Sequence, residues 1–203
     1  LKERQKRNFG YMKPEGYRKA LRLMQLAGRF RRPVVSLVDT PGADPNVPSE
    51  ERGISEAIAR NLREMAVLPT PTVAVVVGEG GSGGALGIAV CDVVLMTAHS
   101  FYSVIAPEGC ASILYRDSAR GAEAARAMRV TAQDALELGL IDGVVPEPPG
   151  GAHRDPAAAA EAVKAAILEH LDRLEPLSDA ELLARRAARL RSLGRFAPAP
   201  DVS

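Results

Sequence analysis

The chain has 203 residues, 46% of them hydrophobic, with 26 basic and 25 acidic side chains. That size suits one globular domain with its own core, and a net charge near zero excludes a general attraction for nucleic acid or anionic lipid. No apolar run reaches the roughly 18 residues of a membrane span, and no signal peptide is recognisable. We therefore expect a cytoplasmic enzyme or enzyme subunit.

Helical and extended segments alternate along the first half of the chain. Apolar residues at helical spacing predict a helix over Pro14–Ala27, with Tyr17 on its apolar face, and a β-branched run predicts a buried strand at Val34–Val38. A second helix is expected near Ser49–Ala66, followed by a strand at Val73–Val77. Strands joined by helices indicate βαβ units and a mostly parallel sheet.

Beyond that strand the sequence predicts three short strands, two short helices and a helical end. The strands are expected at Val93–Met96, Phe101–Val104 and Gly143–Val145, and the helices at Pro107–Leu114 and between Thr131 and Gly139. After Pro156 only helical patterns remain. We therefore expect an α/β core over residues 1–155 and a helical region over residues 156–203.

The cysteines and histidines of this chain suggest no metal site. Cys91 and Cys110 lie in apolar contexts without the spacing of a metal or redox motif, so we expect reduced core thiols. No histidine stands beside a glycine-rich segment. His99 lies between two strands and is expected to be structural, His170 falls in the last helical region, and His153 either packs or contacts substrate.

The most informative segment follows the strand at Val73–Val77, where five of the seven residues 78–84 are glycine. Glycine is needed where a backbone turns sharply or where a ligand must approach the main chain. A small-residue segment, Ala85–Val90, then begins a predicted helix. A strand, a glycine turn and a helix start point several bare N–H groups at one place, which favours a negatively charged group there.

Several interpretations of this run remain open. Gly78, Gly80 and Gly83 fit a dinucleotide fingerprint, but the acidic residue that this motif needs is missing, because Asp92 comes early and precedes its strand. The glycines can also form an oxyanion hole that holds an enolate-like oxygen, or a tight turn that packs a helix against a strand.

A nucleophile elbow is the remaining alternative. Gly80-x-Ser82-x-Gly84 fits the pattern of a serine hydrolase, and Asp142 and His153 follow in the chain order of that class. Ser82 otherwise fills a crowded turn.

Two predicted loops lie at the same edge of the sheet. The segment from Asp39 to Gly42 follows the first strand and the glycine run follows the next, and ligands bind at the carboxyl ends of parallel strands. We expect Gly42 to expose an amide. Asp39 either orders this loop as a hydrogen-bond acceptor or makes an Asx-type turn before Pro41.

The charged residues in the second half of the chain each allow a structural and a functional interpretation. Glu108 either orients substrate or is favoured by the positive end of the helix that begins at Pro107. The helix after Ser178 is expected to present a solvated basic face, and the alternative is that this face covers a partner or binds RNA. Its basic residues are Arg185, Arg186, Arg189 and Arg191.

A set of segments in chain order follows one recognisable pattern: Asn8–Gly10, Pro14–Met24, Asp39–Ala43, Glu50–Gly53, Ser55–Leu62, Gly78–Leu86, Tyr102–Ile105, Pro107–Leu114, Leu140–Asp142, Pro146–Glu147 and Gly150–Arg154. Together these segments resemble one known family, the carboxyltransferase alpha subunit of acetyl-CoA carboxylase. The chain after Pro156 resembles the helical tail of the family only loosely. Members of the family have an N-terminal part before the segment that corresponds to Leu1–Arg7, and we expect this chain to lack it.

The resemblance implies a crotonase-like spiral of ββα units with a C-terminal helical extension. It implies the alpha half of an enzyme that transfers a carboxyl group from carboxybiotin to acetyl-CoA and forms malonyl-CoA, the first committed step of fatty acid synthesis. Carboxybiotin would come on a biotin carboxyl carrier protein and would not be bound covalently here. The implied partners are a zinc-containing beta subunit in an α2β2 assembly and, in the larger ATP-dependent complex, biotin carboxylase.

In this interpretation the site is built from main-chain amides. The ureido oxygen of biotin is expected at the N–H groups of Gly83, Gly84 and Ala85, each worth on the order of 3–4 kcal/mol, and the biotin N1 anion removes the need for a protein base. The expected substrate-binding residues are Gly42, Gly80, Gly81, Ser82, Glu108 and Gly109. The alternatives are a serine hydrolase that uses Ser82 and a non-catalytic crotonase-fold scaffold subunit.

Overall fold

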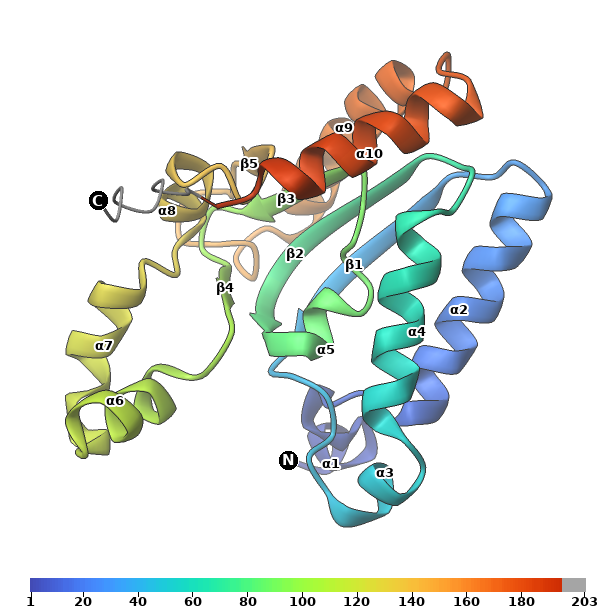
Figure 1. Ribbon diagram of the computed structural model, residues 1–203. Coiled ribbons are helices and arrows are strands. Elements are labelled where there is room, and N and C mark those ends of the chain that lie inside the picture. Colours follow the sequence, from blue (N-terminus) through green and yellow to red (C-terminus); the bar gives the residue numbers. More distant parts are fainter. Residues whose placement is uncertain (195–203) are drawn as a thin grey trace, which may run out of the picture.

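A computed structural model of the chain describes residues 1–194. Its centre is a parallel sheet of β1 (Val34–Thr40), β2 (Thr72–Gly81), β3 (Val93–Thr97) and β5 (Gly143–Val145), in the order β1-β2-β3-β5 (Figure 1). A fifth strand, β4 (Phe101–Ser103), pairs with the last residues of β2, Glu79–Gly81. Every predicted strand is therefore present, and all pairings between these strands are parallel.

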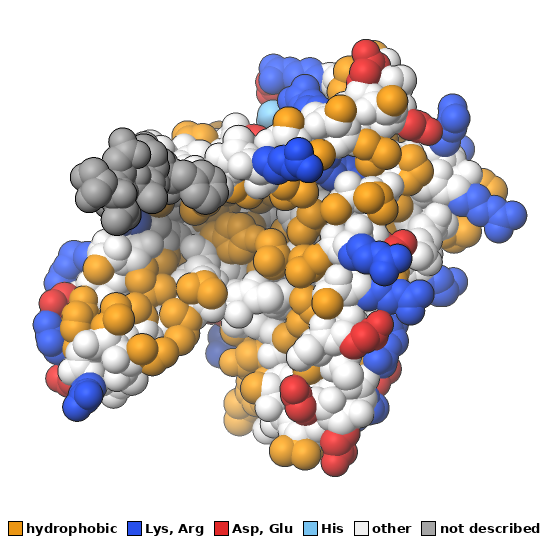
Figure 2. All heavy atoms as spheres, in the orientation of Figure 1, with side chains coloured by type: hydrophobic (Ala, Val, Ile, Leu, Met, Phe, Trp, Pro, Cys, Tyr) orange, Lys and Arg blue, Asp and Glu red, His pale blue; other side chains and the backbone are white. Residues whose placement is uncertain are grey.

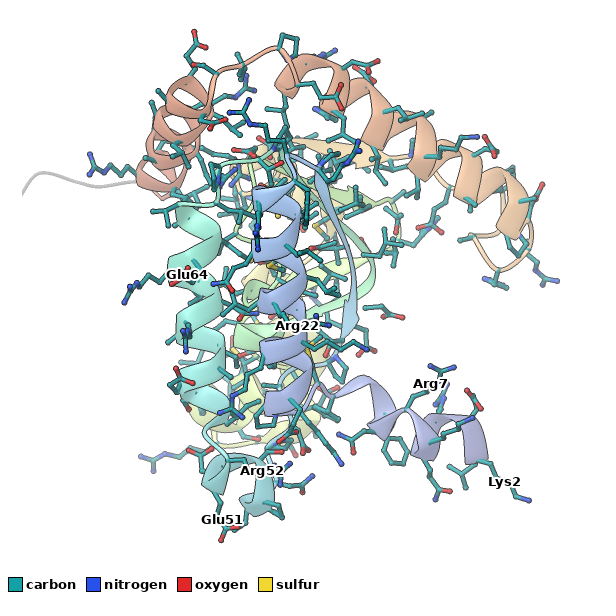
Figure 3. The ribbon with its side chains drawn as sticks, turned by 90° about the vertical axis from the view of Figure 1, so that its right-hand side faces the viewer. Lys2, Arg7, Arg22, Glu51, Arg52 and Glu64 are labelled. Carbon is teal, nitrogen blue, oxygen red and sulfur yellow. The ribbon has the colours of Figure 1, made fainter. Side chains whose placement is uncertain are left out.

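Two helices cover one face of the sheet. The helices α2 (Pro14–Arg29) and α4 (Ile54–Ala66) lie side by side, with charged side chains such as Arg22 and Glu64 on the outside (Figure 3). Their apolar faces pack on β1, β2 and β3 in the larger core cluster. The amphipathic spacing of α2 explains this arrangement. The apolar face predicted for α2 is the face that packs on the sheet, and Tyr17 on that face is fully buried.

The prediction of one helix over Ser49–Ala66 is wrong. The chain forms α3 (Val47–Glu51), breaks, and begins again as α4. Gly53 stands between them with φ 73°, a left-handed conformation that continues no α-helix and that glycine adopts without strain. This break lets α4 run parallel to α2 along the sheet, with Arg52 near Glu15 at one end and Glu64 near Gln25 at the other.

The opposite face of the sheet packs against the C-terminal helices. Residues Leu171 and Leu174 of α9 (Pro156–Leu174) join Val73, Val75 and Leu95 in a second core cluster. The next helix, α10 (Asp179–Ser192), begins with a capping box between Ser178 and Glu181. The division of the chain into residues 1–155 and 156–203 stays a prediction, and residues 195–203 lie outside the described part.

Between β4 and β5 the chain leaves the sheet. The helices α6 (Pro107–Tyr115), η2 (Ser118–Arg120) and α7 (Gly121–Met128) form a lobe that stands away from the body (Figure 1), and α8 (Ala132–Glu137) returns to it. Thr131 caps α8 as predicted, because its Oγ1 accepts the Asp134 N–H at 3.2 Å. Large apolar side chains are exposed on and beside this lobe (Figure 2).

The two remaining short helices, α1 (Lys2–Lys6) and η1 (Asn8–Gly10), precede α2, and α5 belongs to the site. Cys91 and Cys110 are free thiols, as predicted, but only Cys91 is a core residue, and burial raises its pKa to about 12. Within residues 1–194, no helix has both the length and the hydropathy that crossing a bilayer requires.

The prediction that the basic face of α10 is solvated is wrong for Arg186, because this side chain is fully buried. Its guanidinium donates to both carboxylate oxygens of Asp92 at 2.8 and 2.7 Å. It also donates to three backbone oxygens in and just after the last turn of α4, those of Met65, Leu68 and Thr70, at 2.7–2.9 Å. A helix end leaves carbonyls without partners, and this side chain supplies the missing donors. Arg186 thus fastens α10 to the core.

Candidate active site

The glycine run is the end of a strand rather than a turn. Because β4 and β1 both pair with residues around Gly80, β2 continues to Gly81. The short helix α5 (Ser82–Leu86) follows at once, so the predicted helix start at Ala85 is three residues late. Ser82 itself has φ 52°, an uncommon conformation for a residue other than glycine.

Most glycines in this run are required by contacts within the chain. A Cβ at Gly81 would overlap the backbone of Pro41, and a Cβ at Gly84 would overlap the backbone of Gly42 and Ala43. Main-chain atoms cannot move aside as a flexible side chain does. The two segments at this edge of the sheet are therefore packed backbone against backbone.

Gly83 differs from its neighbours. No heavy atom outside its immediate surroundings lies within 4 Å of the position that its Cβ would take. It stands in the first turn of α5, where N–H groups lack the carbonyl of a preceding turn. Gly83 is thus the place in this run where the main chain faces open space.

The loop after β1 is held by hydrogen bonds to the glycine run and within itself. Asp39 Oδ1 accepts the Glu79 N–H at 3.0 Å, so the interpretation of Asp39 as a loop-ordering acceptor is confirmed. The N–H of Gly42 is donated to Thr40 Oγ1 at 3.1 Å. The expectation of a free amide at Gly42 is therefore wrong, and any substrate contact of this residue stays a prediction.

Two side chains from the flanking helices hold α5 in place. The Tyr17 hydroxyl donates to the Gly84 carbonyl at 3.0 Å, and Asn61 Nδ2 donates to the Gly87 carbonyl at 3.1 Å. Burial raises the pKa of Tyr17 to about 12, so its hydroxyl stays a donor from neutral pH well into the alkaline range. Nothing in the sequence singled out Tyr17 except its place on a buried face.

Two cavities meet at Ser82. One of about 340 Å³ lies beside Gly83 and is mostly apolar. Its walls come from α5, β3, β4 and the end of α10, through residues such as Leu86, Val94, Tyr102 and Leu190. Its volume and lining are those of a small-molecule site. The charged residue on its wall, Arg189, is paired with Asp142 at 2.8 Å.

The second cavity, of about 410 Å³, lies between the end of β2 and the start of α6. Gly81, Ser82 and Glu108 line it, together with Glu79 and Ser103. It corresponds to the hollow between the α6–α7 lobe and the body, where Figure 2 shows hydrophobic side chains.

The remaining predicted residues lie deeper or apart. Gly84 and Ala85 are buried in α5, Gly80 packs against Tyr102, and Gly109 packs against Ile105. Sequence reasoning missed Tyr102 and Arg189 as wall residues and Glu79 as a residue of the second cavity.

The residues of the hydrolase alternative are not gathered at Ser82. Within the described part of the chain, residues 1–194, no histidine lines either cavity around Ser82. Asp142 accepts hydrogen bonds from Arg189 and from the Val94 N–H, and the His153 ring lies against Gly151. A nucleophilic serine needs a base within hydrogen-bond reach, so this geometry favours main-chain donors over a triad.

The fold and the amide-lined site agree with the comparison to known families. The family model for acetyl co-enzyme A carboxylase carboxyltransferase-like proteins matches residues 1–194. The chain belongs to this family. The resemblance that the sequence motifs indicated is thereby confirmed.

Relatives named acetyl-coenzyme A carboxylase carboxyl transferase subunit alpha cover nearly the whole chain. The one from Geobacter metallireducens is 56% identical over 196 residues, which are 97% of this chain and 62% of the relative. The one from Methylococcus capsulatus is 58% identical over 96% of this chain and 61% of the relative. The chain thus spans about three fifths of the length of these relatives.

Solved structures confirm the crotonase-like α/β fold. Transcarboxylase 12S superimposes with a TM-score of 0.62 at 20% identity, over 95% of this chain and 34% of that chain. A Pseudomonas malonate decarboxylase hetero-dimer gives a TM-score of 0.69 at 20% identity, over 87% of this chain and 71% of that one. At such identities the likeness concerns the fold alone.

Proposed function

We propose that the chain is the alpha half of an acetyl-CoA carboxylase carboxyltransferase. It would help to move a carboxyl group from carboxybiotin, presented by a biotin carboxyl carrier protein, to acetyl-CoA, with malonyl-CoA as the product. The relatives that are more than half identical carry this name. The observation that carries the proposal is Gly83, whose main chain faces a cavity while neighbouring glycines are locked against the chain's own backbone.

The geometry suits stabilisation of a developing oxyanion. Carboxybiotin supplies the carboxyl group and develops negative charge on its ureido oxygen as that group leaves. The expected donors, the N–H groups of Gly83, Gly84 and Ala85, belong to one short helix that is fixed from two sides. Gly83 is the one of the three that lines the cavity, so its main chain is already in place to meet this charge. Removing one such donor typically costs about 3–4 kcal/mol of transition-state stabilisation.

The walls around Gly83 assist these donors. Leu86, Val94 and Leu190 give the adjoining cavity an apolar lining, which keeps water from competing for the bound oxygen. Hydrogen bonds to a charged oxygen are stronger where water is excluded. The chain itself would therefore bind and orient the oxygen.

A beta partner, with its own zinc, would supply the acetyl-CoA side of the site. The apolar surface beside and on α6 supports a protein contact, because Val104, Ile113 and Leu114 are 77%, 70% and 65% exposed. We expect the carrier protein and biotin carboxylase as further members of a cytoplasmic α2β2-based complex. Among residues 1–194 no cluster of His, Cys, Asp or Glu that could hold a metal is found.

The reverse reaction tests the proposal. Free biotin and malonyl-CoA are supplied to a full-length subunit that contains this chain, alone and combined with a beta subunit, and biotin carboxylation is measured. We expect activity in the mixture only. A complex that forms and stays silent, with an intact fold, would contradict the proposal and favour the scaffold interpretation.

A Ser82→Ala variant separates the proposal from the hydrolase alternative. Among residues 1–194 no histidine lines the cavities around Ser82, so we expect carboxyl transfer to stay within a factor of about two or three of the wild-type rate. We also expect no labelling of the wild-type protein by a fluorophosphonate probe. Labelling that disappears in the variant, together with loss of activity, would establish Ser82 as a nucleophile instead.

A further inference from the structure

Tyr17 lies in the middle of α2 and is completely buried. Its hydroxyl reaches across to α5 and donates to the Gly84 carbonyl at 3.0 Å. The ring occupies the space next to Gly87, where a Cβ would come within 2.9 Å of Tyr17 Cε1. The contact therefore joins two segments separated by 67 residues through one directed hydrogen bond.

The Gly84 carbonyl depends on this donor. In α5 the Gly87 N–H is donated to the Gly83 carbonyl, and the next N–H, that of Ile88, is donated to the Ala85 carbonyl. The Gly84 carbonyl between them receives the tyrosine hydroxyl instead. Without Tyr17 a buried carbonyl would lose its partner, which costs free energy and leaves that peptide freer to tilt.

The same peptide unit follows Gly83 directly in α5. A trans peptide is planar, so the Gly84 C=O and the Ala85 N–H point in opposite directions within one plane. A bond that fixes the carbonyl therefore fixes the orientation of the whole peptide. Because this peptide is buried, it serves as the support for Gly83, whose main chain faces the cavity.

We propose that Tyr17 is a positioning residue for carboxyl transfer. Its hydroxyl orients the Gly84–Ala85 peptide and so holds the first turn of α5, in which the exposed main chain of Gly83 meets the charge that develops on the substrate oxygen. This role rests on the proposed function. It extends the site to a side chain of α2 that touches neither substrate nor cavity.

Tyr17→Phe tests the role, because it removes one oxygen and keeps the ring in place. We expect kcat of the reverse reaction in the full-length complex to fall roughly tenfold, with KM for biotin unchanged within about a factor of two. Thr70→Val is the matched control, since the buried Thr70 donates its Oγ1 hydroxyl at 2.8 Å to the Arg32 carbonyl, a backbone acceptor outside the site. The control is expected to lower the melting temperature similarly and to leave kcat unchanged.

An NMR measurement follows the same peptide independently of catalytic activity. Labelling with ¹³C-glycine and ¹⁵N-alanine selects Gly–Ala peptides, of which this chain has four. In the full-length subunit we expect the Ala85 amide resonance to move in Tyr17→Phe and to stay in place in Thr70→Val.

The possible outcomes distinguish a failure of the positioning role from a failure of the proposed function. A kcat in Tyr17→Phe equal to that of Thr70→Val, or an Ala85 resonance that does not move, would overturn the positioning role. An inactive wild-type complex would instead overturn the proposed function and the role together, and the resonance would still show whether Tyr17 orients the peptide.

Discussion

A Gly83→Val variant is expected to lose at least about a hundredfold in carboxyl transfer while it keeps its fold. The new side chain would enter the open space beside the main chain of Gly83, where no heavy atom beyond its chain neighbours and its own helix backbone lies within 4 Å of the Cβ position. It would therefore meet no steric resistance from the protein and would exclude an oxygen from the N–H groups. Malonyl-CoA-dependent biotin carboxylation measures the loss, and thermal unfolding shows that the fold is intact.

Gly84→Val is the matched comparison one residue away. There the Cβ would overlap the backbone of Gly42 and Ala43, so we expect the free energy of unfolding to fall by about 3 kcal/mol or more. Loss of activity in that variant would carry no information about the site. A Gly83→Val complex that assembles and works at the wild-type rate would contradict a catalytic role for these amides, and the scaffold interpretation would then be favoured.

This pair of glycines shows how far sequence reasoning reaches. The density of glycine correctly marks the place where β2, α5 and the loop after β1 meet. It does not separate glycines that face a cavity from those pressed against main chain, because both need the absence of a Cβ. That distinction comes from the partner segment, Asp39–Ala43, which lies about 40 residues away and whose path depends on the register between β1 and β2.

The strands and most helices were predictable for a simpler reason. Their apolar spacing matches the surfaces that they bury: Tyr17 and Met24 on α2 and Met65 on α4 are at most 5% exposed. The exceptions are local. One left-handed glycine, Gly53, breaks a continuous amphipathic pattern, and the pairing with β4 extends β2 through residues that would otherwise form a turn.

The arginines of α10 show a case in which the sequence-based prediction failed. Leu182, Arg186 and Leu190 follow one another at four-residue spacing, so Arg186 lies on the apolar face of α10, and this spacing is the signal that was overlooked. Charge alone predicted a solvated side chain. Its partner, Asp92, stands 94 residues earlier and was considered only as part of a cofactor motif. No local pattern connects the two.

Replacing Arg186 by methionine is therefore expected to destabilise the protein strongly. The change leaves the buried Asp92 carboxylate without its cation and leaves three backbone carbonyls without their donor. Breaking a buried ion pair from one side costs about 3–5 kcal/mol, which corresponds to a fall in melting temperature of roughly 10 °C for a chain of this length. Urea and thermal unfolding measure the change.

Two further variants make that result specific. Arg185→Met alters the exposed neighbour and is expected to stay within about 0.5 kcal/mol of the wild type. Asp92→Asn added to Arg186→Met removes the unpaired charge, so part of the loss should return, although the three carbonyls stay without a donor. If Arg186→Met unfolded like Arg185→Met, the buried pair would contribute nothing to stability. Because α10 also carries Leu190 on the wall beside Gly83, the recovered double variant would show whether a loosely held α10 still closes that cavity.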